Sequence, residues 1–306
     1  MSYLFDDAET HEFQTIIDFL RFGLTEAHVS KLHYGHGTDN AWDDIRALIL
    51  GSLSLPDDIE PQLLQARLTK EEKVMLLQQL KRRIIDRVPT PYLINLSNFA
   101  GLSFFVDNRV LIPRSPIAEL IHQQFTPWIN PDKVTRVLDL CTGSGCIAIA
   151  CCYAFPNAHC DAVDISPQAL EVAAVNRARH ELEDELTLIK SDCFSALESV
   201  NYDIIVSNPP YVGAAEMCTL PKEYSHEPNI ALETDNNGLA LVETILFNAH
   251  AYLSEQGILV VEVGNSDEAL QEAYPHVPFT WLEFEYGGHG VFILTRQQLQ
   301  NYFHKT

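Results

Sequence analysis

Apolar residues recur at helical spacing in the first third of the chain. Two runs place them at i, i+3, i+4 and i+7, or close to that spacing: Phe13, Ile16, Ile17 and Leu20, and then Trp42, Ile45, Leu48 and Ile49. A third run begins with Thr69, has Glu72 three residues later as in a capping box, and stops before Pro89. These patterns predict amphipathic helices and a small helical domain over residues 1–90.

The pattern changes after residue 90. Short apolar pieces are broken by turn-forming residues such as Asn98, Gly101 and Asp107, which predicts a β-hairpin in a linker over residues 91–115. From residue 116, helical stretches alternate with apolar runs at 136–141, 160–165, 186–190, 202–206 and 257–263. Continuous apolar runs separated by helices are typical of a parallel sheet that is covered on both faces.

The last two apolar runs, 280–286 and 291–295, are separated by only four residues, which include three glycines. They predict an antiparallel hairpin, because parallel neighbours need a long crossover connection. The chain is therefore predicted to be an α/β protein. It combines a small N-terminal helical domain with a Rossmann-like sheet over residues 116–306 that ends in an antiparallel hairpin.

Composition narrows the class of protein. The 306 residues are 46% apolar and 20% charged, as in compact globular proteins, and the formal net charge of -22 repels nucleic acid and favours basic partners. The segment from Met1 to Asp7 does not resemble a signal peptide, and no apolar stretch is long enough for a membrane span. Seven cysteines without a Cys-x-x-Cys pair predict neither a disulfide framework nor a metal site. We therefore expect a cytoplasmic protein.

A candidate cofactor site follows the first strand of the predicted sheet. Thr142, Gly143, Ser144 and Gly145 lead from this strand into a helix, and glycines there let backbone N–H groups approach a ligand. Gly143, Gly145 and Ala148 also fit the dinucleotide pattern G-x-G-x-x-A. A nicotinamide cofactor, or a tight turn without a ligand, therefore remains an alternative at this point.

Acidic residues follow the next two strands. Asp164 lies 19 residues after Gly145, where a carboxylate accepts hydrogen bonds from ribose hydroxyls, and Ile165 comes directly after it. Asp192, followed by Cys193, is placed to accept from an adenine amino group. A solvated loop acid is the alternative interpretation of Asp192.

The fourth strand ends in Asn208, Pro209, Pro210 and Tyr211. Two prolines remove two N–H donors, so the carbonyl groups here are not all used by the sheet. Oδ1 of Asn208 and the carbonyl of Pro209 can each accept one hydrogen of a planar NH2 group, on which Tyr211 can stack. A strand-ending turn is the alternative. An amide nitrogen is a poor nucleophile, so positioning must carry the catalysis, and we assign no catalytic histidine.

In this order, the motifs resemble the HemK family of protein glutamine N5-methyltransferases. The resemblance runs nearly end to end and includes Val-Leu-Ile-Pro-Arg at 110–114, Glu227-Pro228, Ala231-Leu232 and Gly238-Leu239. It implies a class I methyltransferase fold with S-adenosylmethionine as cofactor. It places Cys141, Thr142, Gly143, Ser144 and Gly145 around the methionine portion, Asp164 on the ribose and Arg114 beside the methionine carboxylate.

Three departures from the family pattern favour its ribosomal branch. Cys141 stands where most members have glycine, Ser115 and Pro116 follow the arginine, and Cys193 follows Asp192 where the release-factor branch often has an aromatic residue. The resemblance then implies methylation of a glutamine in large-subunit ribosomal protein number three. This partner is basic, and neither a membrane nor direct contact with nucleic acid is expected.

Other functions remain alternatives. One is glutamine methylation of release factors, and another is methylation of a nucleic-acid base, because adenine and cytosine also present a planar NH2 group. The charge of -22 disfavours the second. A nicotinamide-dependent oxidoreductase would leave the motif from Asn208 to Tyr211 unexplained. A ribosome assembly factor without catalysis would not need to bind the cofactor.

Overall fold

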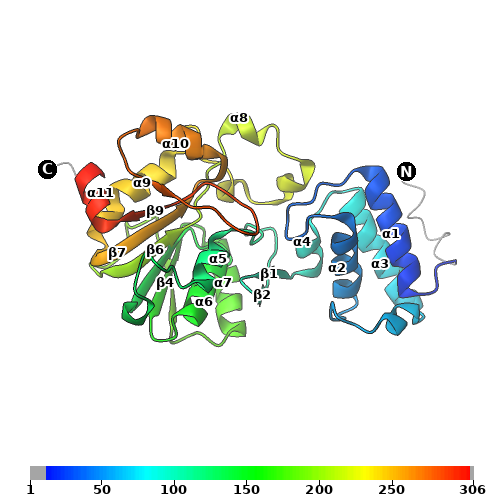
Figure 1. Ribbon diagram of the computed structural model, residues 1–306. Coiled ribbons are helices and arrows are strands. Elements are labelled where there is room, and N and C mark those ends of the chain that lie inside the picture. The colour runs from blue at the N-terminus through cyan, green and yellow to red at the C-terminus, as the bar shows by residue number, and fades with distance from the viewer. Residues whose placement is uncertain (1–11, 304–306) are drawn as a thin grey trace. The chain divides into compact units, whose positions relative to one another are not determined.

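The computed structural model describes residues 12–303, so the segment from Met1 to Asp7 lies outside the described residues. The chain divides into two compact units (Figure 1). One is helical and contains the residues up to Ser97 together with Val106–Asn108 and Pro221–His226, and the other contains the remainder. Within residues 12–303, none of the helices has the length and apolar character needed to cross a membrane.

The helical unit confirms the helices predicted from apolar spacing. It contains α1 (Ile16–Ser30), α2 (Ala41–Ser52), the 3-10 helix η2 (Pro61–Gln65), α3 (Lys70–Ile84) and α4 (Thr90–Ile94). The predicted capping box is present: the Thr69 hydroxyl accepts from the Glu72 N–H at 3.2 Å, and the Glu72 carboxylate accepts from the Thr69 N–H at 2.7 Å. Leu93 of α4 is buried in this core, so the predicted linker starts as part of the helical unit.

A buried charge network joins residues 221–226 to the helical unit. Arg83 is 2% exposed and donates to Asp44 at 2.7 Å, and its second guanidinium nitrogen lies 3.7 Å from Glu223. Glu223 also accepts from the His33 N–H at 3.0 Å and from Arg87 at 3.3 Å. Burial by itself raises the pKa of Glu223, but these donors outweigh it and the pKa is lowered. A segment within the range predicted for the catalytic domain therefore packs with the helices.

The predicted hairpin forms as β1 (Ser97–Phe99) and β2 (Leu102–Phe104). Phe99 and Phe104 are buried in the core of the α/β unit. The helices of this unit are α5 (Ile117–His122), α6 (Cys146–Ala154), α7 (Pro167–Arg179), α8 (Ala214–Met217), α9 (Ala240–Asn248), α10 (Asp267–Ala273) and α11 (Arg296–Phe303). Short 3-10 helices lie at η3 (Pro131–Lys133), η4 (Lys222–His226), η5 (Asn229–Ala231), η6 (Ala249–Ala251) and η7 (Gly264–Ser266), of which η4 falls within the helical unit.

The α/β unit is built on a sheet whose seven described strands have the order β5-β4-β3-β6-β7-β9-β8. Their bounds are β3 (Arg136–Leu140), β4 (His159–Asp164), β5 (Leu186–Lys190), β6 (Tyr202–Ser207), β7 (Leu253–Glu262), β8 (Thr280–Trp281) and β9 (Val291–Thr295). The first five strands pair in parallel, and β9 pairs antiparallel with both β7 and β8. Apolar residues of α5 and α6 pack on one face of the sheet and those of α9, α10 and α11 on the other, as predicted.

The terminal hairpin is antiparallel as predicted, but its first strand is shorter than the predicted 280–286. It ends at Trp281, and the chain then runs as a loop to β9. The carboxylate of Glu119 accepts the N–H groups of Glu285 and Tyr286, each at 3.0 Å. The Leu282 N–H still donates to the Val291 carbonyl at 3.0 Å, and beyond it the contacts with Glu119 and the φ of 88° at Gly287 hold residues 285–287 in the loop.

Candidate functional site

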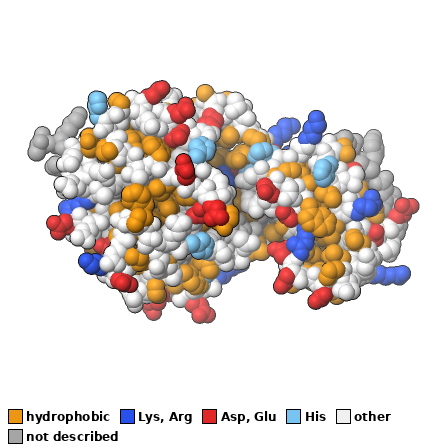
Figure 2. Space-filling view, in the orientation of Figure 1, with side chains coloured by type: hydrophobic (Ala, Val, Ile, Leu, Met, Phe, Trp, Pro, Cys, Tyr) orange, Lys and Arg blue, Asp and Glu red, His pale blue; other side chains and the backbone are white. Residues whose placement is uncertain are grey.

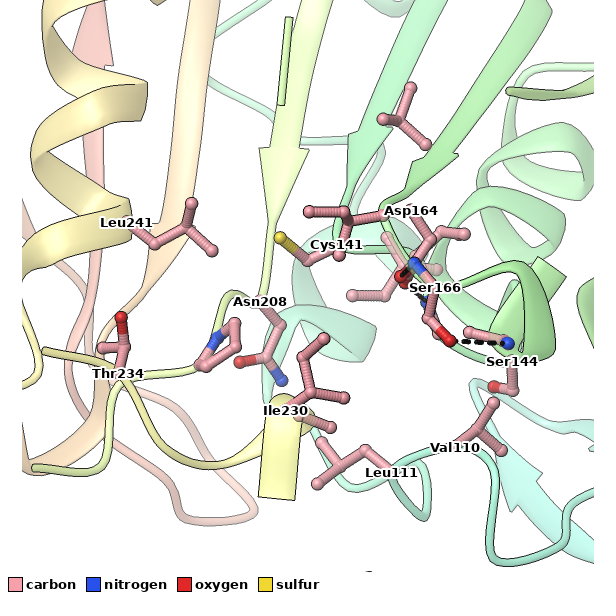
Figure 3. Close-up of a pocket in the computed structure, with 18 of the residues that line it drawn as sticks. Val110, Leu111, Cys141, Ser144, Asp164, Ser166, Asn208, Ile230, Thr234 and Leu241 are labelled. Atoms are coloured by element: carbon pink, nitrogen blue, oxygen red, sulfur yellow. Dashed lines mark hydrogen bonds between the residues drawn. The ribbon is translucent and has the colours of Figure 1, made fainter. Parts of the chain in front are cut away.

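A cavity of about 400 Å³ lies at the carboxyl edge of the parallel strands (Figure 3). It is the size of a small-molecule site. Its lining includes these residues that the sequence analysis selected: Arg114, Cys141, Thr142, Gly143, Ser144, Asp164, Ile165, Asp192, Cys193, Asn208 and Pro210. Gly145, Pro209 and Tyr211 lie outside this lining. The structure thus brings most of the predicted site residues around one space.

The glycine loop between β3 and α6 is a tight left-handed turn. Cys141, Gly143 and Gly145 have φ values of 61°, 55° and 80°. The Thr142 N–H donates to the Val163 carbonyl and the Gly145 N–H to the Thr142 carbonyl, both at 2.9 Å. A Cβ on Gly143 would meet open space, so it is the positive φ that favours glycine there. The backbone of this loop therefore forms part of the cavity wall.

Asp139 supports this loop from beneath, a role that the sequence analysis missed. Its side chain is buried on β3, and Oδ2 accepts from the Thr142 hydroxyl and from the Ala148 N–H at 3.1 Å. The other oxygen, Oδ1, has no hydrogen-bond partner within residues 12–303. Burial raises the pKa of Asp139 to about 7. An acidic residue in the middle of an apolar strand was the available signal in the sequence.

Asp164 joins the glycine loop to the start of α7. Its two oxygens accept from the Gly143 N–H and the Ser166 N–H, each at 2.9 Å, and the Ser166 hydroxyl accepts from the Ala169 N–H at 3.2 Å as the cap of α7. Figure 3 shows Asp164 and Ser166 on one side of the cavity. Burial raises the pKa of Asp164. Since a carboxylate oxygen has two lone pairs, Asp164 can still accept from a ligand hydroxyl.

The wall beside Asp164 is largely apolar. Ile165 is 50% exposed although it lines the cavity, and the Asp192 side chain is exposed. Cys193 is 8% exposed, and burial raises the pKa of its thiol to about 11. The thiol is therefore neutral near physiological pH. Such a wall suits a flat aromatic group.

Asn208 lies directly after β6 and lines the cavity, and in Figure 3 its amide extends toward Ile230. Pro209 is buried and Pro210 lines the cavity. The hydroxyl of Tyr211 donates to Glu262 at 3.2 Å, and the Tyr211 carbonyl accepts from the Ser266 hydroxyl at 2.8 Å. The contact with Glu262 was not predicted.

Arg114 lines the cavity, and its guanidinium is held by a carboxylate of the protein. Its two terminal nitrogens donate to the two oxygens of Glu227 at 2.6 and 2.8 Å. The Glu227 side chain is 0% exposed and also accepts from the Ile112 N–H at 3.0 Å. The sequence analysis selected Glu227 only as part of the resemblance. Binding of the methionine carboxylate by Arg114 stays a prediction.

Residues 122–223 match the family described as Methyltransferase small domain. A curated protein from Francisella tularensis, named ribosomal protein uL3 glutamine methyltransferase, is 46% identical over 94% of this chain and 92% of its own length. A protein of the same name from Xanthomonas campestris is 48% identical over 95% of this chain and 94% of its own length. The chain belongs to the family of these ribosomal protein uL3 glutamine methyltransferases. The predicted ribosomal branch is thereby confirmed.

Solved structures show the same fold at low sequence identity. The crystal structure of the hMettl16 catalytic domain in complex with MAT2A 3'UTR hairpin 6 has a TM-score of 0.50. It is 18% identical to this chain and covers 74% of it and 81% of its own length. The predicted Rossmann-like class I methyltransferase fold is confirmed by this likeness and by the seven-stranded sheet of the described residues.

The pKa of Asp139 leads to a pH prediction. The pKa of about 7 in the folded state lies above the ordinary value of 3.8. The protonated carboxyl therefore contributes stability that is fully present below pH 3.8 and is lost as the pH rises through about 7. We expect Asp139→Asn, which keeps the acceptor without the charge, to gain stability relative to the parent protein between about pH 4 and about pH 8. Urea denaturation across this range measures it. A difference in the free energy of unfolding between the two proteins that stays constant with pH would contradict the prediction.

Proposed function

We propose that the protein transfers a methyl group from S-adenosylmethionine to the side-chain amide nitrogen, N5, of a glutamine in ribosomal protein uL3. The observation that carries the proposal is the position of Asn208. Its amide faces the same cavity as the glycine loop and Asp164, in a chain whose relatives are named uL3 glutamine methyltransferases. An acceptor for the target amide and a candidate cofactor site therefore share one space.

The lining residues fit S-adenosylmethionine. Asp164 would accept from the ribose hydroxyls, and Ile165 and Cys193 would contact the adenine ring. Asp192 would accept from the adenine amino group. The loop from Cys141 to Gly145 would surround the methionine portion, with Arg114 nearby. When bound, the cofactor supplies a methyl group on a positively charged sulfur.

The residues after β6 would orient the target amide. Oδ1 of Asn208 and the carbonyl of Pro209 would each accept one of its two hydrogens, which fixes the plane of the amide and turns the nitrogen toward the methyl group. These acceptors also stabilise the positive charge that develops on the nitrogen as it is methylated. Because the prolines fix φ, the acceptors would be held in place before the substrate binds.

Charge favours a basic protein as the partner. The formal net charge is -22, and in Figure 2 the Asp and Glu side chains are scattered over the visible face of the α/β unit. Ribosomal proteins are typically basic, so the overall field would attract uL3 and repel free nucleic acid. Recognition of uL3 by the helical domain over residues 1–90, and a cytoplasmic location, belong to the same proposal.

A direct test uses labelled cofactor. Purified uL3 should accept the methyl group on one glutamine, which mass spectrometry identifies. A Gln→Asn substitution at that position should leave uL3 nearly inert because the amide is one methylene too short, and Gln→Glu should remove methylation because a carboxylate offers no NH2 group. Labelling of a release factor or a nucleic acid in place of uL3 would refute the proposal.

Cofactor affinity depends on Asp164. We expect Asp164→Ala to weaken S-adenosylmethionine binding by about 1.5 to 3 kcal/mol, because the ribose hydroxyls lose a charged acceptor. Calorimetry measures the affinity. Asp184→Ala is the control, since this aspartate is exposed in the loop before β5. Equal affinities of the two variants would remove Asp164 from the cofactor site.

Turnover depends on Asn208. We expect Asn208→Ala to lower kcat by about 100- to 1,000-fold, because the oxygen that orients the target nitrogen is lost. Cofactor affinity should be nearly unchanged. Asn201→Ala, at an exposed position beside the other end of β6, is the control. Near-normal turnover by the Asn208 variant would eliminate the proposed mechanism.

A further inference from the structure

Glu262 is a buried carboxylate at the end of β7. Its side chain is 6% exposed and lies outside the lining of the cavity. One oxygen accepts from the Tyr211 hydroxyl at 3.2 Å and the other from the Ser115 hydroxyl at 2.5 Å. Burial of a carboxylate is unfavourable without such partners. The two hydrogen bonds of Glu262 therefore hold the hydroxyls of Tyr211 and Ser115 in place.

The two hydroxyls belong to segments that shape the cavity. Ser115 follows Arg114, lines the cavity, and accepts from the Ile117 N–H at 3.2 Å at the start of α5. Tyr211 ends the motif that begins with Asn208. Glu262 thus links two segments. One carries Ser115 in the cavity wall and precedes the sheet in sequence, and the other is the motif after β6 that ends with Tyr211. The three residues are far apart in the chain, separated by 147 and 51 positions.

The position of Asn208 depends on the position of Tyr211, because the two prolines between them make the backbone stiff. Pro209 and Pro210 have fixed φ angles, so a rotation of Tyr211 cannot be absorbed freely in the intervening backbone. The Tyr211 ring lies so close to Gly264 that a Cβ there would be 2.5 Å from it. The hydroxyl of Ser266 holds the Tyr211 carbonyl. The ring, the carbonyl and the hydroxyl of Tyr211 are each in contact with the segment 262–266.

We infer that Glu262 is a positioning residue for methyl transfer. By holding the hydroxyls of Tyr211 and Ser115, it sets the place of the Asn208 oxygen and the Pro209 carbonyl relative to the methyl donor. This inference rests on the proposed function of the site. Glu262 does not touch the substrate, so its loss should lower kcat and leave cofactor affinity unchanged.

Position and charge can be separated by the choice of variant. Arg114 and His289 are the charged or titratable groups that act on Glu262 besides its hydroxyl partners. Glu262→Gln keeps an oxygen for the Tyr211 hydroxyl and turns an NH2 group to Ser115, whose oxygen can accept. Glu262→Ala removes both contacts. Glu255→Ala, exposed near the other end of β7, is the matched control.

The experiment measures kcat, KM for uL3 and cofactor affinity for these variants and for Tyr211→Phe and Ser115→Ala. We expect Glu262→Ala and Tyr211→Phe each to lower kcat by about 100-fold, the effect of a misplacement of about 1 Å. The double variant of these two should be no worse than Glu262→Ala alone, because Glu262→Ala already removes the contact that Tyr211→Phe removes. Glu262→Gln should recover most of the activity, and Glu255→Ala should match the parent protein.

Three results would overturn the inference. The first is an additive loss of kcat in the double variant Glu262→Ala with Tyr211→Phe, and the second is a Glu262→Gln protein as inactive as Glu262→Ala. The third is a near-normal kcat of Tyr211→Phe, because this variant removes only one hydroxyl and leaves the packing of the ring unchanged. Failure of the proposed function is recognised separately, because the parent protein would then not methylate uL3. In that case the crystal structure of Glu262→Ala decides: a displaced Tyr211 supports the positioning role, and an unmoved one refutes it.

Discussion

The pairing of buried carboxylates with loop donors is the interaction on which the candidate site depends. Parallel strands bring their carboxyl ends to one edge of the sheet, but the loops that leave this edge carry N–H groups that no strand satisfies. Asp139 and Asp164 accept from the glycine loop and the helices beside it. Glu227 and Glu262 accept from the segments that carry the arginine and the tyrosine. A buried charge is tolerated only with such partners, so each carboxylate fixes its loop.

The glycine loop also shows how a cysteine can occupy a position of positive φ. A non-glycine residue in this region is strained by about 1–2 kcal/mol, and Cys141 adopts it beside Gly143 and Gly145. The thiol lines the cavity, and burial raises its pKa well above the ordinary value. A protonated thiol is a weak nucleophile compared with a thiolate. The proposed methyl donor would therefore meet a neutral thiol at this position, which does not compete for the methyl group.

Residues 221–226 belong to the helical unit although they lie between two stretches of the α/β unit in the sequence. Leu220 and Glu227, on either side of this segment, belong to the α/β unit, whereas Glu223 is buried with Arg83 in the helical unit. The segment comes between the tyrosine motif and the glutamate that holds Arg114. Removal of one partner from a buried ion pair typically costs about 3–5 kcal/mol. The helical unit therefore depends on a part of the chain more than 120 residues after α4, its last α-helix among the described residues.

The sequence by itself determined the features that are encoded locally. Strand and helix periodicity, the Thr69 capping box, the glycine loop and the motif from Asn208 to Tyr211 each lie within a short stretch, and their order carried the resemblance to the family. The residues at 115, 116, 141 and 193 carried the choice of branch. Only the tertiary structure decided the pairing of Glu227 with Arg114, of Glu262 with Tyr211, and of Glu223 with the helices. These partners are separated by 50 to 140 residues, and no local pattern specifies which buried acid meets which donor. The short β8 strand has the same origin, because its residues alternate like a longer strand, but beyond Leu282 the N–H groups of Glu285 and Tyr286 are bound by Glu119, from another part of the chain.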